Sequence, residues 1–142
     1  MGKLDNLGAI VTGAAEGIGE AIALELASNG AKVACIDFNE KSGSDTAKKI
    51  IDSGGEAVFI KTDISDPDQV KKMVNSSLEF LGSIDILVNN AAKFTFGAVE
   101  DVSQEEWEDI LKINVIGYST CVKEALPHLK KSGKSAVVNL AS

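Results

Sequence analysis

Residues 9–19 read Ala-Ile-Val-Thr-Gly-Ala-Ala-Glu-Gly-Ile-Gly, an apolar run that breaks into a glycine-rich turn. The apolar part predicts a short buried strand over residues 8–12. The apolar residues that follow recur at helical spacing on one face: Ile18, Ala21, Ile22 and Leu26. Glycines allow a sharp turn and a close approach of backbone to ligand, and free amides at a helix start attract phosphate oxygens. The stretch therefore predicts strand, turn and helix, and by itself it fits a phosphate-binding turn and a plain connecting turn equally well.

Composition narrows the classes of protein to consider. The chain has 142 residues, 44% of them hydrophobic, with 13 glycines against 2 prolines, which favours one α/β domain with many tight connections. Its net charge of −7 argues against nucleic acid or an anionic membrane as a partner. No stretch has the apolar length of a membrane span, and the first residues lack the apolar core of a signal peptide. Cys35 and Cys121 lie in apolar runs and read as buried thiols, so we expect a cytoplasmic protein.

Strands and helices are predicted to alternate along the whole chain. Further strands are predicted at residues 31–36, 57–61, 84–88 and 135–141, and further helices at 40–53, 66–82 and from 103 onward. Short connections between alternating elements require a doubly wound parallel sheet with right-handed crossovers, in the order 3-2-1-4-5. The last strand would be an apolar sheet edge, and such edges invite pairing with another chain.

The last predicted helix begins at a capping box, Ser103 to Glu106, and contains one polar residue in its apolar stripe. The stripe is expected to face inward and consists of Trp107, Ile110, Leu111, Asn114, Val115, Tyr118, Val122, Ala125, Leu126 and Leu129. Burying the Asn114 amide unpaired would cost about 1–3 kcal/mol. An interruption of the helix at Asn114 would avoid that cost and aim the amide at a cleft. A core asparagine with satisfied hydrogen bonds is the alternative.

Polar residues collect where the predicted strands end. Asp37 follows the second strand, where dinucleotide-binding folds place the acid that binds the adenosine ribose. A 2′-phosphate ~4 Å from this carboxylate would cost about 1–4 kcal/mol, and Glu16 in the turn acts in the same direction, so NAD is favoured over NADP. A strand-end cap is the alternative role for Asp37. Asp63, after the third strand, fits an adenine contact and a loop cap equally well.

These features together resemble the short-chain dehydrogenase/reductase family over the whole chain. Residues 12–19 look like its Thr-Gly-x-x-x-Gly-x-Gly motif, and residues 89–92 look like its Asn-Asn-Ala-Gly segment with alanine at the last position. The resemblance implies a Rossmann fold. It implies that the cofactor-binding residues are Thr12, Gly13, Glu16, Gly17, Ile18, Gly19, Asp37, Phe38, Asp63, Ile64, Asn90, Ala91 and Ala92. It also implies that Asn114 holds a water for proton relay and that Ser142 is the catalytic serine.

The resemblance further implies a Tyr-x-x-x-Lys pair on the next helix, and this chain has no such pair. Its only tyrosine, Tyr118, is followed four residues on by Val122. We therefore expect the N-terminal part of an NAD-dependent oxidoreductase of small alcohols or ketones, inactive by itself and binding no metal. A truncated module that keeps only the nucleotide site is the alternative, and a methyltransferase is a remote one. Relatives pair through the long helix, which implies a homo-oligomer when complete, although its outward face does not look conspicuously apolar.

Overall fold

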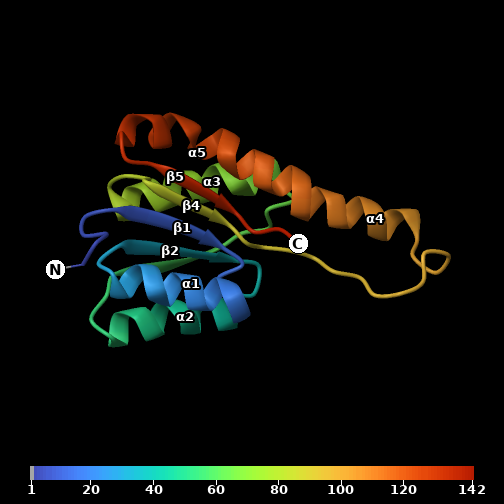
Figure 1. The fold of residues 1–142 in the computed structure, drawn as a ribbon, viewed down its shortest axis with the longest axis horizontal. Coiled ribbons are helices and arrows are strands. Elements are labelled where there is room, and N and C mark those ends of the chain that lie inside the picture. The colour runs from blue at the N-terminus through green and yellow to red at the C-terminus, as the bar shows by residue number, and fades with distance from the viewer. Residues whose placement is uncertain (1) are drawn as a thin grey trace.

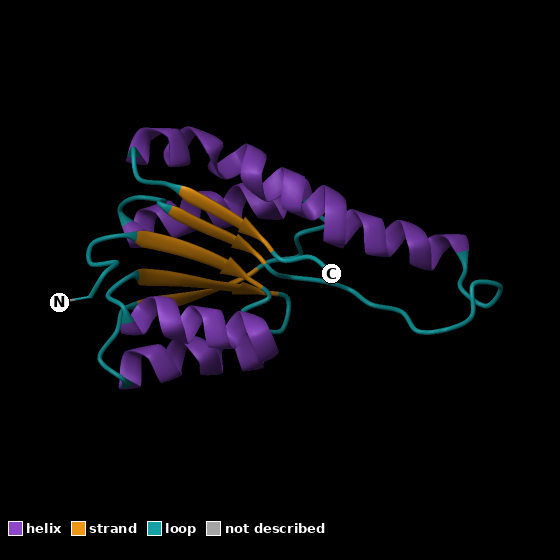
Figure 2. Cartoon of the chain, in the orientation of Figure 1, coloured by secondary structure: helices purple, strands orange, loops and turns teal. Residues whose placement is uncertain are grey.

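The computed structural model describes residues 2–142 as a five-stranded sheet with helices on both faces (Figure 1). Figure 2 shows the strands side by side, with all the arrowheads toward the same edge. The elements are β1 (Gly8–Thr12), α1 (Gly17–Ser28), β2 (Lys32–Asp37), α2 (Glu40–Asp52), β3 (Ala57–Lys61), α3 (Pro67–Leu81), β4 (Ile86–Asn89), α4 (Gln104–Leu111), the π-helical turn η1 (Lys112–Gly117), α5 (Tyr118–Ser132) and β5 (Ala136–Asn139).

The strand order is β3-β2-β1-β4-β5 with every neighbouring pair parallel, as predicted. The central strand β1 is buried on both faces, which is typical of a parallel sheet covered by helices. Ile10 and Leu87 belong to the core beneath α3 and α5, whereas Val11 and Val88 belong to the core beneath α1 and α2. Parallel strands bring all their carboxyl ends to one edge, and that edge is where the predicted site residues follow β1, β2, β3 and β4.

Helix α3 begins and ends at the residues that the sequence indicates. The Asp66 carboxylate accepts the backbone amides of Asp68 and Gln69, and Pro67 takes the first helical position, where no amide is needed. Gly82 ends the helix with φ 81°, a left-handed conformation that glycine adopts without strain.

The predicted long helix is instead two α-helices joined by the π-helical turn η1, and its first part does not face the core. Helix α4 contains no buried residue and projects beyond the sheet (Figure 1). The exposed members of the predicted stripe are Trp107 at 49%, Leu111 at 48%, Val115 at 58% and Leu126 at 39%. The inward orientation predicted for them is wrong, because helical periodicity defines an apolar face without showing whether the sheet reaches it. The exposed surface of α4 and η1 therefore carries apolar side chains of the predicted stripe.

One residue of α1 differs from its predicted orientation. Ile18, predicted on the buried face of α1, is 66% exposed.

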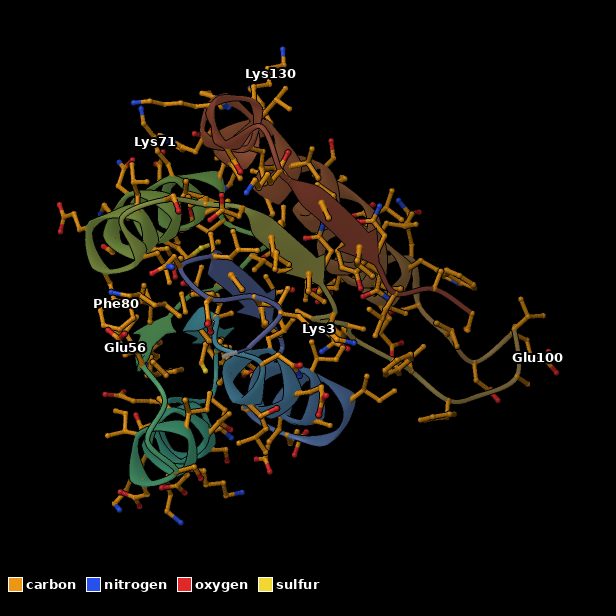
Figure 3. The ribbon with its side chains drawn as sticks, turned by 60° about the vertical axis from the view of Figure 1, so that its left-hand side comes forward. Lys3, Glu56, Lys71, Phe80, Glu100 and Lys130 are labelled. Atoms are coloured by element: carbon orange, nitrogen blue, oxygen red, sulfur yellow. The ribbon has the colours of Figure 1, made fainter. Side chains whose placement is uncertain are left out.

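Among the described residues, strand β5 pairs with β4 alone and is exposed along its length, as predicted for a sheet edge. Between β4 and α4 the chain runs far out from the sheet, and Glu100 lies near the tip of this excursion (Figure 3). No helix within residues 2–142 has both the length and the apolar character to cross a membrane.

Candidate functional site

A cleft of about 840 Å³ opens at the carboxyl edge of the sheet, within the size range of small-molecule sites. All the predicted cofactor-binding residues line this cleft except Thr12 and Gly19. It receives residues from the turn after β1, the ends of β2 and β3, the segment after β4, and the junction of α4 with η1. The structure thus brings together residues that lie far apart in the sequence.

The glycine turn is shaped by close backbone packing. Gly13 has φ 66°, and a Cβ there would lie 2.7 Å from the side-chain nitrogen of Asn90. A Cβ on Gly19 would overlap the carbonyl oxygen of Gly13, so Gly19 lets α1 approach the turn instead of lining the cleft. Gly17 has φ 57° and open space where a Cβ would stand. No side chain caps the start of α1, whose first residues Gly17 and Ile18 line the cleft.

Thr12 and Asn90 fix this turn to the end of β4. The buried Thr12 hydroxyl donates to the Val88 carbonyl at 3.3 Å and accepts the amides of Asn90 and Ala91, each at 3.0 Å. The Asn90 side chain donates to the carbonyls of Thr12 and Gly13, each at 3.1 Å. Thr12 is therefore occupied in positioning the cleft wall and does not face the cleft.

Asp37 lines the cleft and also caps the chain around it. Its carboxylate accepts the amide of Ala15 at 3.0 Å and that of Asn39 at 2.9 Å, so it connects β2 to the glycine turn. The neighbouring Phe38 is 67% exposed in the same cleft, with the Lys61 ammonium 5.8 Å from its ring centre. The capping role predicted as an alternative for Asp37 is present, and it leaves the carboxylate at the cleft surface.

Asp63 caps its own loop and also lines the cleft. One carboxylate oxygen accepts the Ser65 amide at 2.9 Å and the Ser65 hydroxyl at 2.6 Å, which is the predicted loop cap. The residue nevertheless lines the cleft together with Ile64, just after β3, which lies two strands from β1 in the sheet. An adenine contact therefore remains a prediction for Asp63.

Asn114 lies within η1, where the helix is interrupted as expected, and its side chain pairs with the backbone of Lys93. The Lys93 amide donates to Asn114 Oδ1 at 2.8 Å, and Asn114 Nδ2 donates to the Lys93 carbonyl at 2.9 Å. Lys112 and Ile113 line the cleft beside it, whereas Asn114 does not, so the prediction that the interrupted helix aims this amide at the cleft is wrong. The geometry makes the Asn114 side chain a positioning group for the segment after β4.

Residues 8–142 match the family model described as short chain dehydrogenase. This chain belongs to the short-chain dehydrogenase family. An uncharacterized oxidoreductase of Thermotoga maritima is 36% identical over 134 residues, which cover 94% of this chain and 52% of that protein. The meso-2,3-butanediol dehydrogenase of Serratia marcescens is 37% identical over 140 residues, covering 99% and 55%. A crystal structure of a metagenomic short-chain oxidoreductase in complex with NADP has a TM-score of 0.93 at 29% identity, covering 98% and 63%.

The chain spans about half the length of the curated relatives it matches. Ser142, the serine that the resemblance implies, is exposed and lies at the chain end, near the carboxyl edge of the sheet (Figure 1). It does not line the cleft. Its catalytic role therefore stays a prediction.

Several residues that line the cleft were not predicted from the sequence. Lys93 and Phe94 directly follow the Asn-Asn-Ala-Ala segment, and Asp109 and Lys112 come just before Asn114. Asp109 pairs with Lys93 at 2.9 Å and with Lys112 at 3.9 Å. The hydrogen bond and the charge of Lys93 lower the pKa of Asp109 below its ordinary value. The only sequence signal for these residues is their position beside two recognisable motifs.

Proposed function

We propose that this chain is the NAD-binding part of an oxidoreductase that moves a hydride between nicotinamide and a small alcohol or carbonyl substrate. The observation that carries the proposal is the joint lining of one cleft by the glycine turn, Asp37 and the Asn90–Ala92 segment. Membership of the family and relatives that are named oxidoreductases support it. We further propose a cytoplasmic location.

The residues present fit such a cofactor. The turn at Gly13, Gly17 and Ile18 offers backbone without an obstructing Cβ at Gly17, which suits a pyrophosphate. Asp37 suits the adenosine ribose hydroxyls, with Phe38, Asp63 and Ile64 around the adenine. Asn90, Ala91 and Ala92 would hold the nicotinamide ribose side. When bound, the cofactor supplies the hydride, and these residues supply its position and the exclusion of water.

Charge supports NAD over NADP as the cofactor. Asp37 and Glu16 both line the cleft, and neither has an ion-pair partner among the described residues. A 2′-phosphate ~4 Å from a carboxylate costs about 1–4 kcal/mol, or roughly tenfold to several hundredfold in affinity. A related structure contains NADP, so family membership alone does not decide the preference.

We propose that residues 1–142 bind the cofactor and are inactive by themselves. The family's proton donor is a tyrosine with a lysine four residues on, whereas Tyr118 belongs to the core edge and burial raises its pKa. Without a general acid at the substrate oxygen, about 10²–10⁴ in rate is lost. In a complete enzyme Ser142 would donate a hydrogen bond to that oxygen. We also propose a homo-oligomer in that complete form.

Isothermal titration calorimetry of the purified chain with NAD and with NADP tests the proposal. We expect saturable NAD binding and binding of NADP that is weaker by about tenfold or more. A folded chain that gives no NAD signal would refute the cofactor site. Reduction of ketones by NADH at ordinary enzyme rates with the 142-residue chain would refute the proposed inactivity.

A further inference from the structure

Helix α1 begins with two acidic residues and contains no basic one. Glu16 is the N-cap residue and lines the cleft, and Glu20 lies in the first turn. Acidic side chains at this end stabilise a helix, but they repel an anion that would bind the same free amides. The helix start that suits a pyrophosphate therefore carries charge of the wrong sign, unless another element compensates it.

Helix α2 compensates the charge of Glu20. The two helices α1 and α2 lie side by side on the same face of the sheet (Figure 1). The Lys49 ammonium, from the last turn of α2, donates to Glu20 Oε1 at 2.8 Å. This hydrogen bond lowers the pKa of Glu20 below its ordinary value, so the carboxylate is charged at neutral pH. Within residues 2–142, no other ion pair joins α1 to another element.

The second oxygen of Glu20 is connected to the glycine turn by the buried hydroxyl of Thr46. This hydroxyl lies within hydrogen-bond distance of three oxygens: Glu20 Oε2 at 3.1 Å, the Ser42 carbonyl at 3.2 Å and the Ala15 carbonyl at 3.4 Å. Ala15 belongs to the turn, and its amide donates to the Asp37 carboxylate. The Glu20 charge therefore stands directly behind the turn that is proposed to bind the pyrophosphate.

The two side chains are too exposed for their ion pair to stabilise the fold strongly. Lys49 is 55% exposed and Glu20 is 25% exposed, and ion pairs of this kind contribute little to stability. The field of an uncompensated carboxylate, in contrast, extends over about 8–10 Å at physiological ionic strength. That range is sufficient to act on an anion at the adjoining turn.

We propose that Lys49 is a positioning residue for the cofactor's pyrophosphate, because it pairs with Glu20 and cancels that charge behind the glycine turn. This role rests on the proposed function, since the anion concerned is the diphosphate of the proposed cofactor. Lys49 does not line the cleft, so it acts on the ligand through Glu20 alone.

The test is calorimetry of NAD binding to the 142-residue chain and its variants at low ionic strength. Lys49→Met leaves the Glu20 charge uncompensated and should weaken NAD binding by about fivefold. Glu20→Gln removes the charge itself and should bind NAD at least as tightly as the unmodified chain. The double variant should also bind like the unmodified chain, because no charge is left for Lys49 to cancel. Lys48→Met is the matched control: it breaks the neighbouring ion pair with Asp52 on the same helix and should leave the affinity unchanged.

Salt provides a second measurement that a purely structural role would not affect. At about 1 M NaCl the screening length falls to about 3 Å, so the loss in Lys49→Met should largely disappear. Urea denaturation of each variant checks that it is folded, and Lys49→Met and Glu20→Gln should lose similar, small amounts of stability because both break the same exposed pair.

The outcomes separate this role from the proposed function. If NAD binds and Lys49→Met and Glu20→Gln weaken it equally, the pair only holds the helices together, and the role of Lys49 is refuted while the cofactor site stands. An unchanged affinity in Lys49→Met, or a loss that persists at high salt, refutes it too. If the folded, unmodified chain does not bind NAD, the proposed function is refuted, and the role of Lys49 with it.

Discussion

At the scale of single residues, Asp37 shows how one side chain serves both the fold and the proposed ligand. Its two backbone hydrogen bonds, from Ala15 and Asn39, hold the glycine turn against the end of β2. Removing the carboxylate therefore changes the local charge and the position of the turn at the same time. A substitution that separates these effects must keep an oxygen acceptor while removing the charge.

Asp37→Asn removes the charge and keeps one of the two oxygen acceptors, and we predict that it raises the ratio of NADP to NAD affinity by about tenfold, because the repulsion of the 2′-phosphate is gone. Asp37→Ala should raise the ratio similarly but weaken both cofactors, since the turn loses both acceptors. Calorimetry with each cofactor measures the ratio. An unchanged ratio in Asp37→Asn would contradict the electrostatic explanation.

A second residue-scale prediction concerns Asn114→Leu. The substitution removes both hydrogen bonds to the Lys93 backbone, so the Lys93 amide should exchange with solvent about tenfold or more faster, and unfolding should become easier by about 1–3 kcal/mol. Amide exchange followed by NMR measures the first and urea denaturation the second. Ser119→Ala, at an exposed site on α5, serves as the control and should change neither. Unaltered exchange at Lys93 would show that the pairing is not formed in solution.

At the scale of the elements, the sequence predicted those bounds of strands and helices that depend on residues close by in the chain. The strand at 8–12 and the strand at 57–61 have the predicted bounds, and α3 starts and ends at its predicted cap residues. The polar residues after the strands could also be predicted to lie near one another, because a parallel topology brings the carboxyl ends of the strands to one edge. Strand β4 is shorter than the predicted 84–88 strand at its start, where Asp85 turns its side chain to Gly8.

What the sequence did not reveal depends on contacts between distant segments. The α4 stripe looked like a core face, but no part of residues 2–142 covers it. Lys93 and Phe94 lie in an irregular segment whose orientation is set by Asn114 and Asp109, on another element. Periodicity cannot predict a direction that such pairings determine.

Asp85, directly before β4, connects this strand by hydrogen bonds to β1 and to the end of α5. Its buried carboxylate accepts the Gly8 amide at 2.8 Å, the Ser83 hydroxyl at 2.6 Å and the hydroxyl of Ser132, the last residue of α5. Burial alone would raise the pKa of Asp85, but the hydrogen bonds from Ser132, Ser83 and Gly8 together bring it below the ordinary 3.8. A lowered pKa means that the carboxylate stabilises the fold above about pH 4 and loses that effect as the pH falls through the folded-state pKa.

We therefore predict that Asp85→Asn lowers the free energy of unfolding by about 1–3 kcal/mol at pH 7 and that the difference shrinks on going to pH 3. Urea denaturation at several pH values measures it. Asp101→Asn, at an exposed carboxylate in the loop before α4, is the matched control and should leave the pH profile unchanged. A constant difference between pH 7 and pH 3 would mean that the Asp85 charge does not stabilise the fold.

At the scale of the whole molecule, the apolar surface is concentrated on the side of the sheet that carries β5 and α4. Trp107 and Leu111 are about half exposed and stand four residues apart on one helix face. Val137 and Val138 add exposed apolar surface along β5. Exposed apolar surface on this scale indicates an interaction site or an aggregation hazard.

We predict that the chain self-associates in a concentration-dependent way and that Leu111→Lys shifts the equilibrium about tenfold or more toward the monomer. Sedimentation velocity at several protein concentrations measures the distribution. Lys123→Glu, at an exposed polar position on α5, changes charge without removing apolar surface and should have little effect. A chain that stays monomeric at every concentration would contradict the proposed role of this surface.

Asp85 stands at the amino end of β4, whereas Asp37 stands at the carboxyl end of β2, so the length of a strand, at about 3.3 Å per residue, separates the two carboxylates. They share no hydrogen-bond partner. Free-energy changes at sites so far apart add within a few tenths of a kcal/mol. We therefore expect stability toward acid and the proposed cofactor preference to be thermodynamically independent, so that each can be altered without shifting the other.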